Sequence, residues 1–382
     1  MRILQKYKLI FLFLLLLVVT VIVVLFFVRR NNDITFGHST IAASWGHSLV
    51  IKEDGSLWAW GTNWDGELGD GTNEARNTPV MIMENVRHVV SNETGLSMAI
   101  TNDNILWGWG SNRAGLIGND FRNHFTPIQL MENVSDVAIG NRHILILTTN
   151  GDLYGVGENW AGQLGDGTTI DRNEPVHIKS DVRFISTADG HSAAITNDNV
   201  LWTWGINNVG QLGDGTNETR YSPVRIMDNV ATVRTGWLRT AIVTTDGVLW
   251  LRGDNSIPME TSLWHFEDLY LYNLVHQPFL GDVVDVVVRP QYTLILTTDN
   301  RLLAWGENRL DTLWNPQDFA TEVLLKTDVI AVTAGYAHIL AITSDNSLWV
   351  WGWNEYGQIG NGTLENQYTP VHVMTDVAVP VR

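Results

Sequence analysis

Short stretches in which the type of side chain alternates from one residue to the next recur along the chain from about residue 41 onwards. In Leu57–Trp60 and again in Ser97–Ile100, alternate side chains share one face of an extended backbone. A strand places successive side chains on opposite faces, whereas a helical repeat would place apolar residues at positions i, i+3 and i+4. The pattern therefore predicts a protein made of short β-strands.

One seven-residue fragment is repeated along the whole of this region. Leu57–Asn63 (LWAWGTN) has six further copies, at Leu106–Asn112, Leu153–Asn159, Leu201–Asn207, Leu249–Asn255, Leu302–Asn308 and Leu348–Asn354. Each copy contains a glycine, and these glycines lie 46 to 53 residues apart: Gly61, Gly110, Gly157, Gly205, Gly253, Gly306 and Gly352. Seven units of this period indicate a repeat architecture.

Each unit contains four short β-rich runs. In the first units these are exemplified by Leu49–Lys52, the Trp-x-Trp strand, Pro79–Met83 after a proline, and Val86–Val90. Four strands per unit and seven units predict an all-β, seven-bladed propeller of four-stranded antiparallel blades over residues 41–382. Ile41–Ser44 and Val377–Val379 both resemble the first strand of a unit, so we expect one of these ends to complete a blade begun at the other.

An asparagine follows each glycine of the repeat by two positions. These residues are Asn63, Asn112, Asn159, Asn207, Asn255, Asn308 and Asn354. Asparagine is favoured in turns because it forms Asx turns and tolerates left-handed backbone. We interpret the glycines and asparagines as structural positions at the turn that leaves each Trp-x-Trp strand.

In five copies the turn continues into a glycine-rich loop, as in Asn159–Gly165 (NWAGQLG) and Asn207–Gly213 (NNVGQLG). This pattern resembles the regulator of chromosome condensation repeat family over about residues 41–377. The resemblance implies a seven-bladed propeller. We expect this chain to be a membrane-anchored member of the bacterial type. Because members of that family include a nuclear guanine-nucleotide exchange factor and a secreted bacterial β-lactamase inhibitor, it implies protein binding more than any single activity.

The N-terminus has a different composition. Residues 9–28 form an apolar run in which Thr20 is the one polar residue, which is long enough to span a bilayer as a helix. More basic residues precede this run than follow it, which favours a cytoplasmic segment 1–8, a signal-anchor helix 9–28 and a linker 29–40 that leads to a propeller outside the cytoplasm. A cleaved signal peptide remains the alternative.

Charge and composition exclude several classes of function. The net charge is −17, and the first 30 residues contain basic residues but no acidic ones, so the predicted propeller is more acidic still. Such a surface repels phosphate backbones, so we expect no nucleic-acid partner. The chain has no cysteine, which removes disulfides and thiolate chemistry.

Candidate chemistry is weak. His47, His143, His191 and His338 occupy equivalent positions, where a ring would hold them apart, so we interpret them as structural. The Asp-Gly loops at Asp70, Asp166 and Asp214 do not fit the calcium-loop spacing, and we expect no metal or other cofactor. The common hydrolase, zinc-protease and P-loop motifs are absent, which favours a protein that is not an enzyme.

The candidate binding residues are aromatic. Trp64, Trp160, Trp264, Trp314 and Trp353 follow Trp-x-Trp strands, and equivalent loops lie on one face of a propeller. The fifth unit departs most from the repeat, and its irregular segment adds His265, Phe266, Tyr270 and Tyr272 as candidates. Indole groups gathered on one face are typical of binding surfaces, although each one can instead pack on its own blade.

Three functional hypotheses follow. The first is a single-pass protein of the cell membrane whose propeller binds a protein, or a cell-wall glycan, outside the cytoplasm. The second is an exchange factor or regulator of a small GTPase, as the resemblance implies, which requires the propeller inside the cell. The third is an enzyme with a site in the central channel, because such a site leaves no short motif.

Overall fold

The computed structural model describes residues 39–118, 120–254, 275–276, 282–290, 292–306 and 319–380, with side chains not described at residues 275–276, 306 and 319–323. The predicted segments 1–8 and 9–28, most of the linker 29–40, and the candidates Asn255, Asn308, Trp264, His265, Phe266, Tyr270, Tyr272 and Trp314 lie outside these residues. Within this part of the chain, no helix is both long and apolar enough to cross a membrane.

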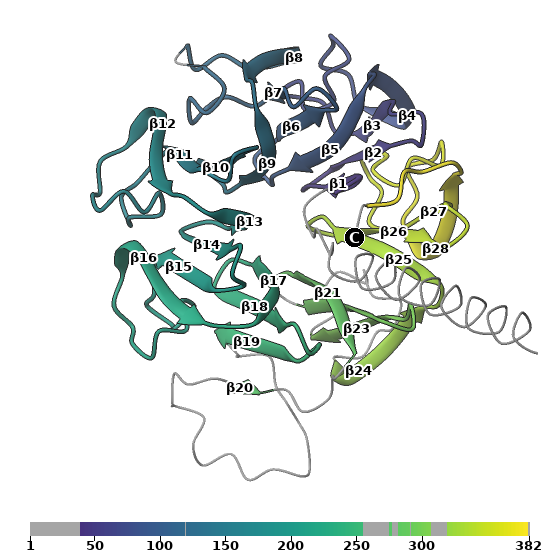
Figure 1. Cartoon of the computed structure of the whole chain (residues 1–382). Helices are drawn as coiled ribbons and strands as arrows, with labels where there is room; N and C mark the ends of the chain where they lie inside the picture. Colours follow the sequence, from purple (N-terminus) through teal and green to yellow (C-terminus); the bar gives the residue numbers. More distant parts are fainter. Residues whose placement is uncertain are drawn as a thin grey trace, which may run out of the picture. The chain divides into compact units, whose positions relative to one another are not determined.

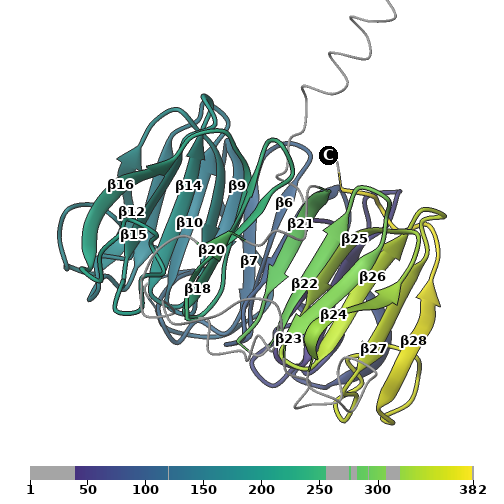
Figure 2. The same ribbon diagram turned by 90° about the horizontal axis from the view of Figure 1, so that it is seen from below.

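The described residues form seven four-stranded antiparallel sheets, each built from consecutive strands. The sheets are arranged around a central axis as the blades of a propeller, with the chain colour passing from blade to blade (Figure 1). The predicted all-β, seven-bladed propeller is therefore confirmed. The side view shows the strands of neighbouring blades standing side by side (Figure 2).

The first strands of the blades lie nearest the axis, where those of neighbouring blades contact one another. They are β1 (Ile41–Ala43), β5 (Val86–Ser91), β9 (Val134–Ile139), β13 (Val182–Thr187), β17 (Val230–Thr235), β21 (Val283–Val288) and β25 (Val329–Ala334). The second strands are β2 (His47–Ile51), β6 (Leu96–Thr101), β10 (His143–Thr148), β14 (His191–Thr196), β18 (Arg239–Thr244), β22 (Tyr292–Thr297) and β26 (His338–Thr343). Nearly every residue of these second strands is buried, because blades pack against both of their faces.

The third strands carry the Trp-x-Trp repeat and the fourth strands form the rim. The third strands are β3 (Leu57–Gly61), β7 (Leu106–Gly110), β11 (Leu153–Gly157), β15 (Leu201–Gly205), β19 (Leu249–Gly253), β23 (Leu302–Gly306) and β27 (Leu348–Gly352). The fourth strands are β4 (Arg76–Met83), β8 (His124–Met131), β12 (Arg172–Lys179), β16 (Arg220–Met227), β20 (Val275–His276), β24 (Phe319–Lys326) and β28 (Gln367–Met374). β4 begins at Arg76, before Pro79, because pairing with β3 extends to Gly61 through irregular register.

Both ends of the described chain close the ring. β1 pairs with β2 from Ile41 to Ala43, and Val377 forms a bridge with Lys52 at the end of β2. The C-terminal end thus adds to the blade begun at the N-terminal end, as expected, but only through this bridge, because β1 itself is the inner strand of that blade. β1 is short because the chain before it turns away to the second blade, where the Ser39 carbonyl accepts a hydrogen bond from the Val89 amide at 2.9 Å.

The core lies between blades. Trp60, Trp109, Trp204 and Trp351, the second tryptophans of four repeats, are fully buried. Trp60 belongs to the same apolar cluster as Leu340 and Ile359 of the last blade. The conserved spacing of the repeat within this chain thus reflects packing from one blade to the next.

Candidate functional site

The loop after each third strand begins at a glycine with left-handed backbone. Gly61 has φ of 107°, and a Cβ there would lie 2.2 Å from the carbonyl oxygen of Gly46. Only glycine fits this approach without displacing the backbone. The equivalent glycines of β7, β11, β15, β19 and β27 also have positive φ.

The asparagine that follows holds the loop through its side chain. The Asn63 amide group donates to Asp70 Oδ1 at 3.0 Å and to the Thr72 carbonyl at 3.1 Å, and its oxygen accepts from the Leu68 amide at 3.0 Å. Asn159, Asn207 and Asn354 make the same kinds of bonds. These asparagines are not in the left-handed region, so the amide, rather than the backbone, explains their recurrence.

An aspartate and an arginine complete three of these loops. Asp166 Oδ1 accepts from the Thr168 amide at 3.0 Å, and its other oxygen accepts from Arg172 Nε at 2.8 Å. Burial acts to raise the pKa of Asp166, but hydrogen bonds from Thr168 and Arg172 outweigh it and hold the pKa below its usual value. Asp70 with Arg76 and Asp214 with Arg220 repeat the arrangement. Across the described residues no group of three or more potential ligands is placed to hold a metal ion.

The four repeated histidines link blades. His47 Nε2 lies 3.0 Å from Ser97 Oγ of the second blade, and that hydroxyl donates to the Glu67 carbonyl at 2.8 Å. Because the hydroxyl proton is used on the carbonyl, Nε2 is the donor to the hydroxyl oxygen. Equivalent pairs join His143 to Ser192, His191 to Thr240 and His338 to Ser48. Burial lowers the pKa of His47 to about 3, so its ring is neutral.

Aromatic side chains from the first and last blades meet on the face of these loops. The Trp45 ring centroid lies 5.9 Å from that of Trp64, 5.5 Å from that of Trp353 and 5.2 Å from that of Tyr356. Tyr356 also contacts Trp64 and Trp353, at 5.0 and 5.1 Å. We call these four residues the aromatic cluster. Trp64 remains 56% exposed, so the cluster has an apolar surface in contact with solvent.

The structure thus brings two of the predicted residues, Trp64 and Trp353, into one cluster. Trp160 is 61% exposed on the equivalent loop of the third blade, outside the cluster. The sequence analysis missed Trp45 and Tyr356, as well as Trp237, which is 59% exposed. Trp45 and Trp237 both lie two residues before the start of a second strand, so comparing that position between repeats would have identified them.

A cavity of about 430 Å³ adjoins the aromatic cluster and extends over the first three blades. Trp45 and Trp64 line one part of it, and Glu67 and Ser111 line another. At its rim Arg113 pairs with Asp65 at 3.0 Å, and Arg142 pairs with Glu158. The site therefore combines aromatic rings with a polar, charged surround.

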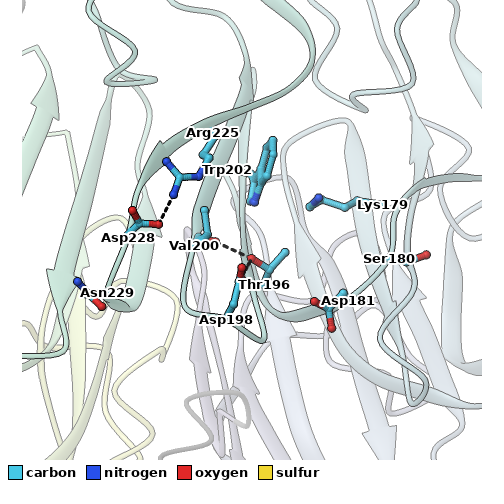
Figure 3. A pocket seen from close by; sticks show the side chains of 10 residues that line it. All are labelled: Lys179, Ser180, Asp181, Thr196, Asp198, Val200, Trp202, Arg225, Asp228 and Asn229. Atoms are coloured by element: carbon cyan, nitrogen blue, oxygen red, sulfur yellow. Dashed lines mark hydrogen bonds and ion pairs between the residues drawn. The ribbon is translucent and has the colours of Figure 1, made fainter.

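A second cavity, of about 370 Å³, opens at the other ends of the strands, between the third and fourth blades. Figure 3 shows Lys179 beside the Trp202 ring, with the Lys179 amine 4.0 Å from its centroid, and Arg225 paired with Asp228. Lys326 lies over Trp349 at the same distance in the last blades. Because this contact repeats, we interpret it as packing between blades and not as a specific site.

The fold and the loops define a sequential seven-bladed propeller with glycine-anchored loops on one face. A family model described as the RCC1-like domain matches residues 26–259. Two models of the regulator of chromosome condensation (RCC1) repeat match residues 329–358 and 345–382. The chain therefore belongs to the RCC1-like domain family, which confirms the family resemblance seen in the sequence.

Solved structures agree on the fold. Human WBSCR16 is 20% identical with a TM-score of 0.72, over 84% of this chain and 94% of that one. Yeast RCC1 (Prp20), in a structure bound to Kap60, is 21% identical with a TM-score of 0.51, over 88% of this chain and 74% of that one. The ectodomain of the Arabidopsis thaliana receptor kinase ACR4 is 14% identical with a TM-score of 0.51, over 86% and 99%. No curated protein matches the sequence.

Proposed function

We propose that this propeller is a membrane-anchored recognition module that binds a protein partner outside the cytoplasm and carries out no catalysis. The observation that carries the proposal is the aromatic cluster, in which Trp64 is 56% exposed at the loop face of the first blade. Large aromatic side chains bury much area at little entropic cost, and binding hot spots are enriched in them.

The surroundings of the cluster favour a protein over a glycan as the partner. The Asp65–Arg113 ion pair lies next to Trp64 in the lining of the cavity, the Arg142–Glu158 pair lies at its rim on the third blade, and Asn141 is bonded to Asp189 of the fourth blade. An apolar centre with a charged, partly solvated rim is the usual anatomy of a protein interface. The acidic composition of the chain favours a partner with a basic surface.

The location outside the cytoplasm rests on the sequence of residues 9–28 and on the excess of basic residues before them. The fold is compatible with this location, because the receptor-kinase ectodomain has it too. Protease treatment of intact cells tests the topology. Cleavage of the propeller in intact cells supports the proposal, whereas protection until the membrane is opened favours an intracellular regulator such as an exchange factor.

Site-specific cross-linking of the full-length protein in its own membrane tests the binding face. A photo-reactive residue at position 64 should capture the same discrete protein as one at position 160. A residue at position 81, where Met81 is 48% exposed on the rim strand β4, serves as the control and should not capture it. Capture from position 81 alone, or equal capture from all three, would contradict a binding surface at the loop face.

A further inference from the structure

The loop of the first blade carries two acidic residues, Asp65 and Glu67, at positions where the corresponding loops of the third, fourth and seventh blades have uncharged residues. Glu67 stands where Gln163, Gln211 and Gln358 stand in the third, fourth and seventh blades. Each glutamine accepts a hydrogen bond from the backbone amide two residues earlier, at 2.9, 3.1 and 3.1 Å. Glu67 accepts the same bond from the Asp65 amide at 2.7 Å. A neutral amide thus satisfies the loop, so the charge of Glu67 has no role in forming it.

The Glu67 carboxylate is buried without a cation. Glu67 is 5% exposed, and its carboxylate forms no ion pair with any residue that the structure describes. Burial raises the pKa of Glu67, and the charge of Asp65 adds to the rise, while hydrogen bonds oppose it. Isolated buried charges are costly, and they are normally paired or bound to a ligand.

Its charged neighbours around the cavity are already paired. Asp65 pairs with Arg113 at 3.0 Å, and Glu93 pairs with Arg289 of the sixth blade at 3.2 Å. Arg142 is occupied by Glu158. Among the acidic residues that line the cavity, Glu67 is therefore the one left to attract a positive charge from outside the described chain.

The rest of the cavity suits a cation with an apolar stem. Trp45 and Trp64 line it, and the faces of indole rings attract ammonium and guanidinium groups. Thr62 and Ser111 also line it and carry hydroxyl groups that can accept hydrogen bonds. Its volume of about 430 Å³ leaves room for one long side chain.

We infer that this cavity receives a lysine or arginine side chain of the protein partner, with its charge at Glu67 and its stem against Trp45 and Trp64. The inference rests on the proposed function, because it specifies which group of the partner the aromatic face recognises. The alternative is that Glu67 is protonated in the folded protein and acts as a glutamine.

Short peptides separate these two possibilities in the full-length protein. The tripeptide amides acetyl-Gly-Lys-Gly and acetyl-Gly-Arg-Gly are titrated at pH 7 into 5-fluorotryptophan-labelled protein, and the Trp45 and Trp64 signals are followed by fluorine NMR. We expect both signals to shift and to saturate. The same peptide with an acetylated lysine, which has the stem but no charge, should bind at least tenfold more weakly.

Glu67→Gln is the decisive variant because three other blades carry glutamine at this position and fold around it. We expect it to lower the affinity for the charged peptides at least tenfold, while Glu74→Gln, the same change at an exposed residue of the same loop, leaves it unaltered. Absence of a saturable shift, or unchanged affinity in Glu67→Gln, would overturn the inference. If the partner captured from position 160 is kept by Glu67→Gln but lost by Trp64→Ser, the cation pocket is wrong while the binding face stands.

Discussion

At the residue scale, glycine positions carry information that the sequence shows only in part. The repeat identifies Gly61 as structural, but it does not show that the residue has left-handed backbone or lies against Gly46. The asparagine two positions later was assigned to a turn from its propensity. Its actual function is to hold the loop through its side-chain amide, whose two N–H groups in Asn63 share four acceptors up to 11 residues away. These partners come close to the asparagine only in the folded loop, so its sequence neighbours do not identify them.

Replacing Gly61 by alanine should destabilise the protein strongly. A left-handed conformation costs a residue with a Cβ about 1–2 kcal/mol, and contact with the Gly46 carbonyl adds to this, so we expect a loss of about 3 kcal/mol or more in the free energy of unfolding. Gly215→Ala is the matched control, because Gly215 has φ of 79° but no atom within 4 Å of an added Cβ. Urea denaturation measures both. Equal losses in the two variants would show that the close approach to Gly46 is unimportant.

At the scale of elements, the strands and their order were predictable and the loops were not. Period-two alternation indicates which runs form strands, since β3 packs Leu57 and Ala59 towards the second blade and Trp60 towards the last. The rim strands were predicted less well: β4 begins three residues before Pro79, because the outer edge needs no apolar residues and tolerates irregular pairing. The sequence predicts two members of the aromatic cluster, Trp64 and Trp353. It does not predict Trp45 and Tyr356, because they join the cluster from loops of different length on two different blades.

The loops of the third, fourth and first blades should depend on their buried aspartate and not on a metal. Asp166→Ala leaves the Thr168 amide and Arg172 Nε without this acceptor and removes one of the acceptors of the Asn159 amide, which we expect to cost about 2–3 kcal/mol. Asp166→Asn should cost less, because Asn361 occupies this position in the last blade and still accepts from the Thr363 amide at 3.1 Å. Thermal unfolding of the two variants measures the difference.

A chelator provides the second arm of this experiment. Because Arg172 already occupies the outer oxygen of Asp166, we expect EDTA to leave the melting temperature of the wild-type protein unchanged. A fall of several degrees on chelation, reversed by calcium, would mean that the loops bind metal after all.

At the scale of the whole molecule, stability depends on ring closure and on the contacts between neighbouring blades, which we call the seams. The sequence predicts seven units but leaves open how the first and last are joined, because Ile41–Ala43 and Val377 look equivalent. In the structure both segments pair with the first blade, since β1 is too short to pair along the whole of β2 and Val377 bridges to Lys52 at its end. The seams between the first and second, the third and fourth, and the last and first blades repeat one pair of bonds. In the first of these, the indole of Trp109 and the hydroxyl of Ser97 both donate to the Glu67 carbonyl, at 3.0 and 2.8 Å.

The buried histidines of these seams should make the propeller sensitive to mild acid. Burial lowers the pKa of His47, His143 and His338 to about 3 and that of His191 to about 4. In the unfolded chain the same groups titrate near 6.5, so between these values the unfolded state binds more protons. Above pH 6.5 the histidines therefore add no pH dependence. Below it each one lowers the free energy of unfolding by about 1.4 kcal/mol per pH unit.

Urea denaturation at intervals from pH 7.5 to pH 4.5 measures this dependence in a range where the aspartates of the loops, whose pKa values lie below the usual one, do not contribute. Glu67 acts with the opposite sign, because its raised pKa means that stability is lost as the pH rises through that value. His143→Leu copies the second blade, which has Leu96 at this position, and should reduce the proton uptake on unfolding by about one proton near pH 5. An unchanged slope in this variant would mean that His143 is protonated in the folded protein, and the conclusion that burial keeps its ring neutral would then be wrong.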